Sequence, residues 1–307
     1  MADREASMTH LPAPRRRNLG TTGITLGPLA WGMWRTTGSA AGTAKLLHGA
    51  LDAGIDVIDT ADIYGWNGSG GFGEVEALLG EVLRADVGLR ERITLVTKGG
   101  VRLPVPYDQS RDYMESALDG SLRRIGTDRI DIYLIHRPDI LTHPQELARF
   151  MEDAVGSGKV RAVGVSNFTP AQIAALAAMI AIPLHVTQPE ISPLRIDALA
   201  DGSMDQAMEL GLCPMAWSPL GGGRLMDAET EREGAVAEAL GALAQDKGVD
   251  ITAAAYSWLM AHPAGVIPIA GSQQQARIAA AGQAVEVRWT REEWYRVYTA
   301  ARGEALP

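Results

Sequence analysis

The stretch GIDVIDTADIYG, residues 54–65, points most directly to the fold. Within it the apolar run Ile55–Asp59 is short and unbroken, with a glycine before it and polar residues after it. Such a run is typical of a strand that is buried on both faces, as in a parallel sheet. The residues just before it, Thr43–Ala53, have a helical pattern that closes at Gly54. The stretch therefore predicts the passage from a helix into a buried strand.

This pattern of helices and short apolar runs recurs along the chain. Two further helical patterns are Asp112–Ile125, which closes at Gly126, and Asp250–His262, which stops before a proline. The apolar runs are Gly27–Met33, Ile55–Asp59, Ile93–Lys98, Ile130–His136, Val160–Ser166, Leu184–Glu190, Cys213–Trp217 and Val266–Ile269. Eight strands that alternate with helices predict an α/β fold, the TIM (β/α)8 barrel.

The N-terminal part of the chain is expected to lie outside this alternation. Residues 1–15 carry charges and prolines but no apolar run, so we expect a disordered tail and not a secretory signal. Asn18–Thr25, with Gly20 and Gly23 as turn signals, predicts a short hairpin that closes the bottom of the barrel. No linker or break in composition divides the rest, so residues 16–307 are expected to form a single domain.

Composition and charge restrict the class of function. The net charge of -9 argues against nucleic acid or an anionic membrane as a partner. No stretch approaches the roughly 20 apolar residues of a membrane-spanning helix. The single cysteine, Cys213, rules out an internal disulfide and fits a reducing compartment. We therefore expect a soluble cytoplasmic protein, and no metal site, because the histidines lack metal-ligand spacing.

Polar or aromatic residues stand where the predicted strands end. In a barrel of this kind the reactive groups lie at the C-terminal ends of the strands. Reading these ends in chain order gives Asp59, Lys98, His136, Ser166 with Asn167, Gln188 with Glu190, and Trp217 with Ser218. Tyr64 lies on the loop after the second strand, five residues beyond Asp59. These strand ends predict a functional site at that face of the barrel.

Seven stretches of the chain resemble, in the same order, motifs of the aldo-keto reductase family. They are GIDVIDTADIYG (54–65), LVTKGG (95–100), YLIHRPD (133–139), VGVSNF (163–168), TQPEISPL (187–194), AWSPLGGGRL (216–225) and IPIAGSQQQAR (267–277). One such motif would be weak evidence for this family, but seven motifs in the same order are highly specific for it. The resemblance runs from about residue 18 to the end of the barrel. It implies an NADP-dependent oxidoreductase that reduces aldehydes or ketones to alcohols by reversible hydride transfer.

The resemblance implies a catalytic tetrad of Asp59, Tyr64, Lys98 and His136. Hydride delivery to a carbonyl carbon builds negative charge on the oxygen, so a proton donor is needed, and Tyr64 is expected to be this acid/base. The Lys98 ammonium favours the phenolate and is expected to lower the tyrosine pKa from its usual value of about 10. Asp59 is expected to keep Lys98 charged by pairing with it. His136 is expected to orient the carbonyl oxygen.

The resemblance also implies a binding site for NADP(H). Ser166, Asn167 and Gln188 match positions that hydrogen-bond the nicotinamide carboxamide. Trp217 stands where most members place a tyrosine, on whose ring the nicotinamide stacks. The loop that is expected to pass over the pyrophosphate contains Ser218, Pro219, Leu220, Gly221 and Arg224.

The adenosine end of the cofactor is expected after the last strand. Gly271 and Ser272 lead into a helix, whose free N–H groups and dipole favour a phosphate. Arg277 can grip that phosphate through two parallel hydrogen bonds, which favours NADPH over NADH. Two features depart from the family pattern. Gly271 and Gln273 stand where many members have a basic residue, and alanines at 280 and 281 replace a common Glu-Asn pair.

Some residues have a structural interpretation beside the functional one. Trp31, Trp34 and Trp66 follow the first two strands and either line an apolar pocket for a small carbonyl or alcohol substrate or serve as packing residues. Arg224 and Arg277 could be surface arginines. The burial of the tryptophans and the contacts of the arginines in the folded protein bear on these alternatives.

Two other functions also fit parts of the sequence. A Schiff-base aldolase needs a lysine at the end of a barrel strand, as Lys98 is, but it has no use for the residues that match the cofactor site. A regulatory subunit that binds NADP(H) and turns over little is the second alternative, because an intact tetrad is compatible with that role as well.

Overall fold

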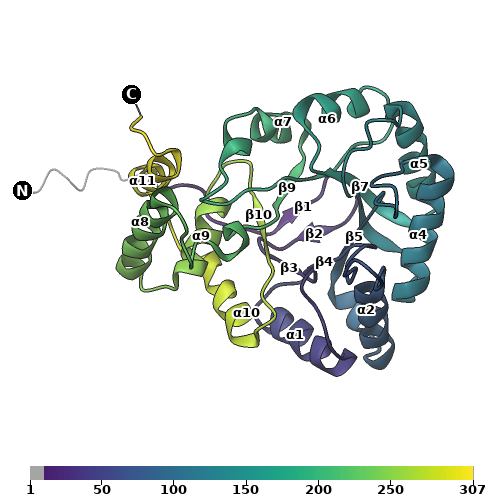
Figure 1. The fold of residues 1–307 in the computed structure, drawn as a ribbon, viewed down its shortest axis with the longest axis horizontal. Coiled ribbons are helices and arrows are strands. Elements are labelled where there is room, and N and C mark those ends of the chain that lie inside the picture. The colour runs from purple at the N-terminus through teal and green to yellow at the C-terminus, as the bar shows by residue number, and fades with distance from the viewer. Residues whose placement is uncertain (1–9, 307) are drawn as a thin grey trace, which may run out of the picture.

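A closed barrel of eight parallel strands forms the centre of the computed structural model, which describes residues 10–306 (Figure 1). The strands follow the order β10, β3, β4, β5, β6, β7, β8 and β9 around the barrel. Their bounds are β3 Ala30–Gly32, β4 Val57–Asp59, β5 Thr94–Gly99, β6 Ile130–Ile135, β7 Val160–Ser166, β8 Val186–Gln188, β9 Cys213–Ala216 and β10 Ile267–Ala270. Each strand overlaps one of the predicted apolar runs, so the predicted TIM (β/α)8 barrel is confirmed.

Helices connect the strands and surround the barrel (Figure 1). The α-helices are α1 Ala40–Asp52, α2 Glu74–Ala85, α3 Leu89–Arg92, α4 Arg111–Ile125, α5 Pro144–Gly156, α6 Pro170–Ala177, α7 Ser203–Leu210, α8 Glu231–Lys247, α9 Ile251–Met260, α10 Gln275–Gly282 and α11 Arg291–Arg302. The three helices predicted from the sequence correspond to α1, α4 and α9. The end of α4 is set by Gly126, whose left-handed φ of 75° lets its N–H reach the Leu122 carbonyl.

A short hairpin closes the N-terminal end of the barrel, as the sequence predicted. Its strands, β1 Arg17–Asn18 and β2 Thr25–Leu26, are antiparallel. Leu19, Ile24 and Leu26 are buried and belong to the same apolar cluster as the side chains inside the barrel. The hairpin therefore seals this end with apolar surface and leaves the opposite end for polar side chains.

Strand alternation decides which side chains face the inside of the barrel. In β4, Val57 belongs to the interior cluster and Ile58 to the core outside the barrel, so Asp59 faces inward again. In β5, Val96 lies inside, and the same step of two residues brings Lys98 inside. The step repeats in later strands, where the inward residues nearest the C-terminal end are His136, Ser166, Gln188 and Trp217.

The last helices add a layer outside the barrel, where α8 and α11 lie side by side at one edge of the molecule (Figure 1). Beneath them the rings of Trp258 and Trp294 stack with their centroids 4.8 Å apart. The main-chain N–H of Leu11 donates to the Trp289 carbonyl (2.8 Å), and His10 forms a bridge with Thr290. The end of the segment that was expected to be a tail is thus paired here, while residues 1–9 lie outside the described part of the chain.

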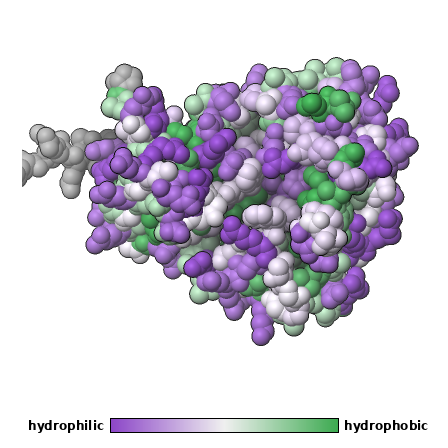
Figure 2. All heavy atoms as spheres, in the orientation of Figure 1, coloured by the Kyte–Doolittle hydropathy of each residue, from purple (hydrophilic) through white to green (hydrophobic). Residues whose placement is uncertain are grey.

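The face of the molecule in Figure 2 is mostly hydrophilic, and its hydrophobic side chains lie in separate groups. Scattered exposed apolar residues of this kind are normal for a folded protein. Within residues 10–306, no helix has the length and apolar character needed to cross a membrane.

Several polar side chains are buried between the barrel wall and helices α2 and α4. Glu76 accepts a hydrogen bond from Thr97 (2.5 Å) and pairs with Arg124 (2.7 Å). Asp62 is completely buried nearby, and neither of its carboxyl oxygens has a hydrogen-bond partner among residues 10–306. Burial raises the pKa of Asp62 well above its usual value, and the charge of Glu76 adds to this. We therefore expect Asp62 to be neutral in the folded protein.

The neutral state of Asp62 predicts how the stability of the folded protein depends on pH. Because the folded state raises the pKa of Asp62, its contribution to stability is fully present below the unfolded pKa and is lost as the pH rises toward the folded pKa. Asp62→Asn cannot ionise, so its stability relative to wild type should increase by about 1 kcal/mol or more between about pH 5 and about pH 8. Urea unfolding at both pH values measures this difference.

The exposed Asp128 offers a matched control, since Asp128→Asn should show no such pH-dependent gain. If the stability difference between Asp62→Asn and wild type is the same at both pH values, Asp62 is not the neutral carboxyl that we infer.

Candidate active site

The four side chains predicted as a tetrad lie together at the C-terminal end of the barrel. Lys98, completely buried at the end of β5, directs its ammonium toward three oxygen atoms. Its Nζ lies 2.7 Å from Asp59 Oδ2, 2.8 Å from the Thr60 carbonyl oxygen and 3.0 Å from Tyr64 Oη. An ammonium has three N–H donors, so all of them are used. Because Tyr64 Oη accepts one of these bonds, its own hydrogen is free for another acceptor.

Burial and charge act in opposite directions on this group of residues. Burial lowers the pKa of Lys98, but Asp59 and Tyr64 together outweigh it, so that the pKa of Lys98 is raised and the ammonium stays charged. Burial raises the pKa of Tyr64, and the positive charge of Lys98 does not offset it. Lys98 lowers the pKa of Tyr64, as predicted, but burial and the negative charge of Asp59 raise it more, so the pKa of Tyr64 lies above its usual value. Loss of solvent around a phenolate outweighs the lysine, and Tyr64 keeps its proton at neutral pH.

His136 follows β6 and lies next to Tyr64. Its main-chain N–H donates to the Gly99 carbonyl (2.8 Å), which holds it against the end of β5. The imidazole and the Tyr64 ring meet edge to face, with centroids 5.9 Å apart. Burial lowers the pKa of His136 well below its usual value, and the nearby positive charges of Lys98 and Arg137 add to this. The imidazole is therefore neutral, with one N–H to donate and one nitrogen to accept.

The three residues predicted to bind the carboxamide form a hydrogen-bonded chain beside the tetrad. Asn167 Nδ2 donates to Ser166 Oγ (2.9 Å) and to the His136 carbonyl (3.1 Å). Ser166 Oγ donates to the Gln188 carbonyl (3.0 Å), and Gln188 Nε2 donates to Asp59 Oδ1 (2.9 Å). Asn167 has a φ of 62°, in a region that asparagine tolerates better than most residues. These polar groups are thus held in fixed positions next to the reactive side chains.

Trp217 follows β9 and is partly exposed at the same end of the barrel. Its indole N–H donates to Asn167 Oδ1 (2.9 Å), which fixes the edge of the ring. The Arg137 guanidinium lies 5.9 Å from the ring centroid. The ring thus offers a flat apolar surface beside Asn167, of the kind on which another aromatic ring stacks.

The loop after β9 contains the residues that the sequence places over the pyrophosphate: Ser218, Pro219, Leu220, Gly221 and Arg224. Gly221 has a φ of 60°, and a Cβ there would lie 2.7 Å from Leu194 Cδ1, so the close approach requires glycine. Arg224 pairs with Glu233 (2.8 Å) and donates from Nε to the Gly221 carbonyl (3.2 Å). The Arg224 side chain therefore braces this loop, and its contact with the pyrophosphate stays a prediction.

The loop after β10, with Gly271 and Ser272, leads into α10, as predicted. Ser272 is held by its carbonyl, which accepts the indole N–H of Trp31 (2.9 Å). Gln273 accepts a hydrogen bond from Thr36 (3.0 Å), so its amide is engaged within the protein. Arg277 lies exposed in the first turn of α10 and forms no ion pair within residues 10–306. Its guanidinium is therefore available to an anion at the start of this helix.

The three tryptophans considered for a substrate pocket lie in different surroundings. Trp31 is completely buried in the core outside the barrel, so its assignment to the pocket is wrong and the packing alternative holds. Trp34 is 65% exposed and Trp66 is 37% exposed, on the loops after β3 and β4. These two remain candidates for contact with a substrate.

Two contacts of this site have no signal in the sequence. The Thr60 carbonyl that receives a Lys98 hydrogen bond belongs to the main chain, so the residue type does not reveal it. The bond from Gln188 to Asp59 joins residues 129 positions apart and depends on closure of the barrel. Both contacts follow from the positions of strand ends around the barrel mouth, and a pattern along the chain does not contain them.

Comparison with known proteins finds relatives that match this chain over nearly its whole length. A 6-dehydroglucose reductase of Novosphingobium aromaticivorans is 62% identical over 304 residues, which cover 98% of this chain and 100% of the relative. A 6-dehydroglucose reductase of Agrobacterium fabrum is 37% identical over 296 residues, which cover 92% of this chain and 97% of the relative. The crystal structure of the thermostable aldo-keto reductase Tm1743, in complex with the inhibitor epalrestat, matches with a TM-score of 0.80 and 25% identity. The match covers 93% of this chain and 99% of that one.

The model of the Aldo/keto reductase family matches residues 24–301, which is most of the chain. The matched region contains all eight barrel strands and the tetrad. The protein is thus an oxidoreductase that acts on carbonyl compounds with a nicotinamide cofactor, and the chain belongs to the aldo/keto reductase family.

Proposed function

We propose that this enzyme uses NADPH to reduce the aldehyde of a 6-dehydro sugar such as 6-dehydroglucose to the primary alcohol. The observation that carries the proposal is the 62% identity to a 6-dehydroglucose reductase over 98% of this chain. A second relative, with 37% identity over 92% of this chain, has the same name.

In the proposed reaction the tetrad handles the carbonyl oxygen. The nicotinamide, when bound, supplies the hydride that the carbonyl carbon receives. Tyr64 donates its proton to the oxygen as negative charge develops there. This role is supported by the Lys98 contact, which occupies an acceptor site of Tyr64 Oη and leaves its hydrogen free. Neutral His136 donates a hydrogen bond that orients the oxygen.

Lys98, kept charged by Asp59, stabilises the negative charge that remains on Tyr64 after it gives up its proton. The phenolate formed next to a buried ammonium is stabilised by the opposite charge, which is strong in a site with little water. Asp59 keeps the ammonium charged at a distance of 2.7 Å. The pair therefore favours the state of the site that exists after proton transfer.

The residues around the tetrad fit a nicotinamide cofactor. Asn167 and Gln188 present amide groups, and Trp217 presents an aromatic face, beside the reactive side chains. At the other end of the proposed site, Arg277 is an exposed cation without an ion-pair partner in residues 10–306. A 2′-phosphate would supply the missing negative charge, and this supports NADPH over NADH.

The aldolase alternative is disfavoured by the state of Lys98. A Schiff base requires a neutral amine that is free to attack a carbonyl carbon. Lys98 uses all three N–H donors within the protein, and its pKa is raised. The regulatory alternative differs from the proposed enzyme in turnover, and is tested below.

Wild-type protein mixed with NADPH and 6-dehydroglucose should consume NADPH, followed by its absorbance, and yield glucose. Tyr64→Phe removes the proton donor but leaves the predicted cofactor contacts in place. We expect its rate to fall by about 100-fold or more, while NADPH still binds.

An aliphatic aldehyde without hydroxyl groups serves as the comparison substrate. Preference for 6-dehydroglucose supports the proposed substrate, and equal rates on both aldehydes would contradict it. NADPH binding without turnover of either compound would favour the regulatory subunit.

Arg277→Gln tests the proposed preference for NADPH. Loss of the cation should raise the KM for NADPH by about 10-fold or more and leave the KM for NADH nearly unchanged, because only NADPH carries the 2′-phosphate. Steady-state kinetics with each cofactor measure this, with Arg296→Gln on exposed α11 as the control. A parallel increase in KM for both cofactors would show that Arg277 does not read the 2′-phosphate.

A further inference from the structure

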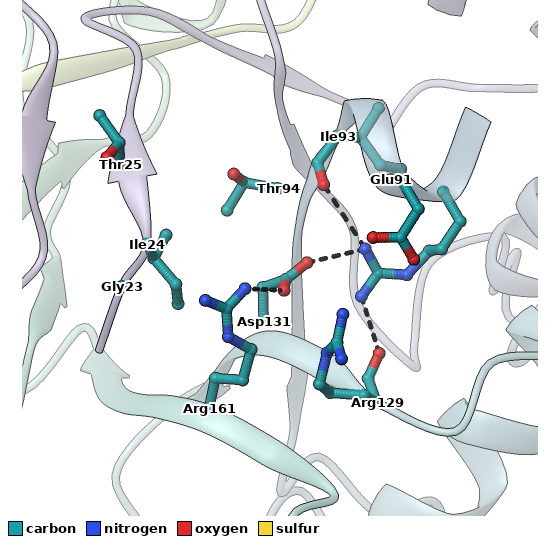
Figure 3. A pocket seen from close by; sticks show the side chains of 10 residues that line it. Gly23, Ile24, Thr25, Glu91, Ile93, Thr94, Arg129, Asp131 and Arg161 are labelled. Atoms are coloured by element: carbon teal, nitrogen blue, oxygen red, sulfur yellow. Dashed lines mark hydrogen bonds and ion pairs between the residues drawn. The ribbon is translucent and has the colours of Figure 1, made fainter. Parts of the chain in front are cut away.

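A second polar cleft lies at the N-terminal end of the barrel, opposite the tetrad. Its volume is about 150 Å³, and it lies between the hairpin and the first residues of β5, β6 and β7. The charged side chains that line it are Arg90, Glu91, Arg129, Asp131 and Arg161. All of these except Arg90 are labelled in Figure 3. Three guanidinium groups thus share a small space with two carboxylates, and the net charge of this lining is positive.

Asp131 forms ion pairs with two of these arginines, Arg90 and Arg161. It is almost completely buried, and its Oδ2 lies 2.9 Å from Arg90 Nη1 while its Oδ1 lies 2.9 Å from Arg161 Nη1 (Figure 3). Oδ2 also accepts the main-chain N–H of Leu95 (2.9 Å). Arg90 and Arg161 donate further hydrogen bonds to the carbonyls of Arg129 (2.8 Å) and Thr22 (3.2 Å). These contacts fix both guanidinium groups around the cleft.

Arg129 has no such partner. Its side chain lines the same cleft next to Asp131 (Figure 3), yet it forms no ion pair within residues 10–306. Its Nε is buried and has no hydrogen-bond acceptor in that part of the chain. A buried N–H without an acceptor is unfavourable, and such groups in native proteins are generally satisfied by water or by an ion.

We propose that this cleft binds a small oxyanion, with phosphate as its representative, on Arg129, assisted by Arg90 and Arg161. Guanidinium groups present paired donors that match the oxygens of phosphate. The cleft is smaller than the about 300–1,000 Å³ typical of pockets for larger ligands, so it admits a single small ion and not a nucleotide. The exposed Glu91 at the same cleft opposes an anion and limits its affinity.

This anion site is separate from the proposed cofactor site. Thr94 begins β5 at the cleft and Lys98 lies four residues further along that strand, which corresponds to about 13 Å. An anion at the cleft connects Arg129, just before β6, and Arg161 of β7 with Arg90 of α3. It therefore acts on the stability of the barrel, and it does not take part in hydride transfer.

The test is a titration of the full chain with sodium phosphate, against sodium chloride at matched ionic strength, with the melting temperature as the readout. We expect phosphate to raise the melting temperature of the wild type, and Arg129→Gln to lose that part of the rise. Arg123→Gln, at an exposed arginine of α4, is the control and should respond as the wild type does. Binding of phosphate at the cofactor site contributes equally to all three proteins and cancels in the comparison.

Glu91→Gln tests the same site without removing an arginine. Loss of this negative charge at the cleft should lower the apparent Kd for phosphate by about threefold. Tighter phosphate binding by Glu91→Gln than by the wild type supports the site, even if Arg129→Gln is too unstable to measure. An identical phosphate response in wild type, Arg129→Gln and Glu91→Gln would overturn the proposal, as would the absence of any response beyond that to chloride.

Discussion

The buried ammonium of Lys98 is the group around which the reactive end of the barrel is organised. A charge without solvent requires acceptors for each of its donors, and Lys98 finds them in Asp59, the Thr60 carbonyl and Tyr64. The carboxylate of Asp59 in turn accepts a hydrogen bond from Gln188. One desolvated cation thus ties the ends of three strands and one loop into a single network. The proposed acid, Tyr64, belongs to that network and is not an independent side chain.

The barrel makes this arrangement available because its two ends are chemically different. Apolar residues of the hairpin, including Leu26, close one end, and the inward positions of β4 and β5 change from valine to Asp59 and Lys98 at the other. The polar network is therefore built on a packed apolar floor that excludes water from below. Low local polarity strengthens the attraction between Lys98 and Asp59, and it also explains why Tyr64 keeps its proton.

The sequence predicts the strands and the residues at their ends well, because buried runs and their polar ends are local patterns. It does not predict how burial and charge balance at Tyr64, since this depends on solvent access and on distances across the barrel. The role of Trp31 likewise depends on the direction of its side chain from β3, which composition does not reveal. The contact of Arg224 with Glu233, and the absence of an acceptor for the buried Nε of Arg129 within residues 10–306, both result from folding and so appear only in the structure.

The central claim is that Lys98 and Tyr64 act as a charged unit in proton transfer to the carbonyl oxygen. It is tested most directly by single-turnover reduction with Lys98→Met, a variant that keeps an unbranched apolar side chain but lacks the ammonium. The account predicts that cofactor binding persists while the rate of carbonyl reduction falls by about 100-fold or more, because the phenolate loses its stabilising charge. A rate close to that of the wild type, with the cofactor bound, would contradict it.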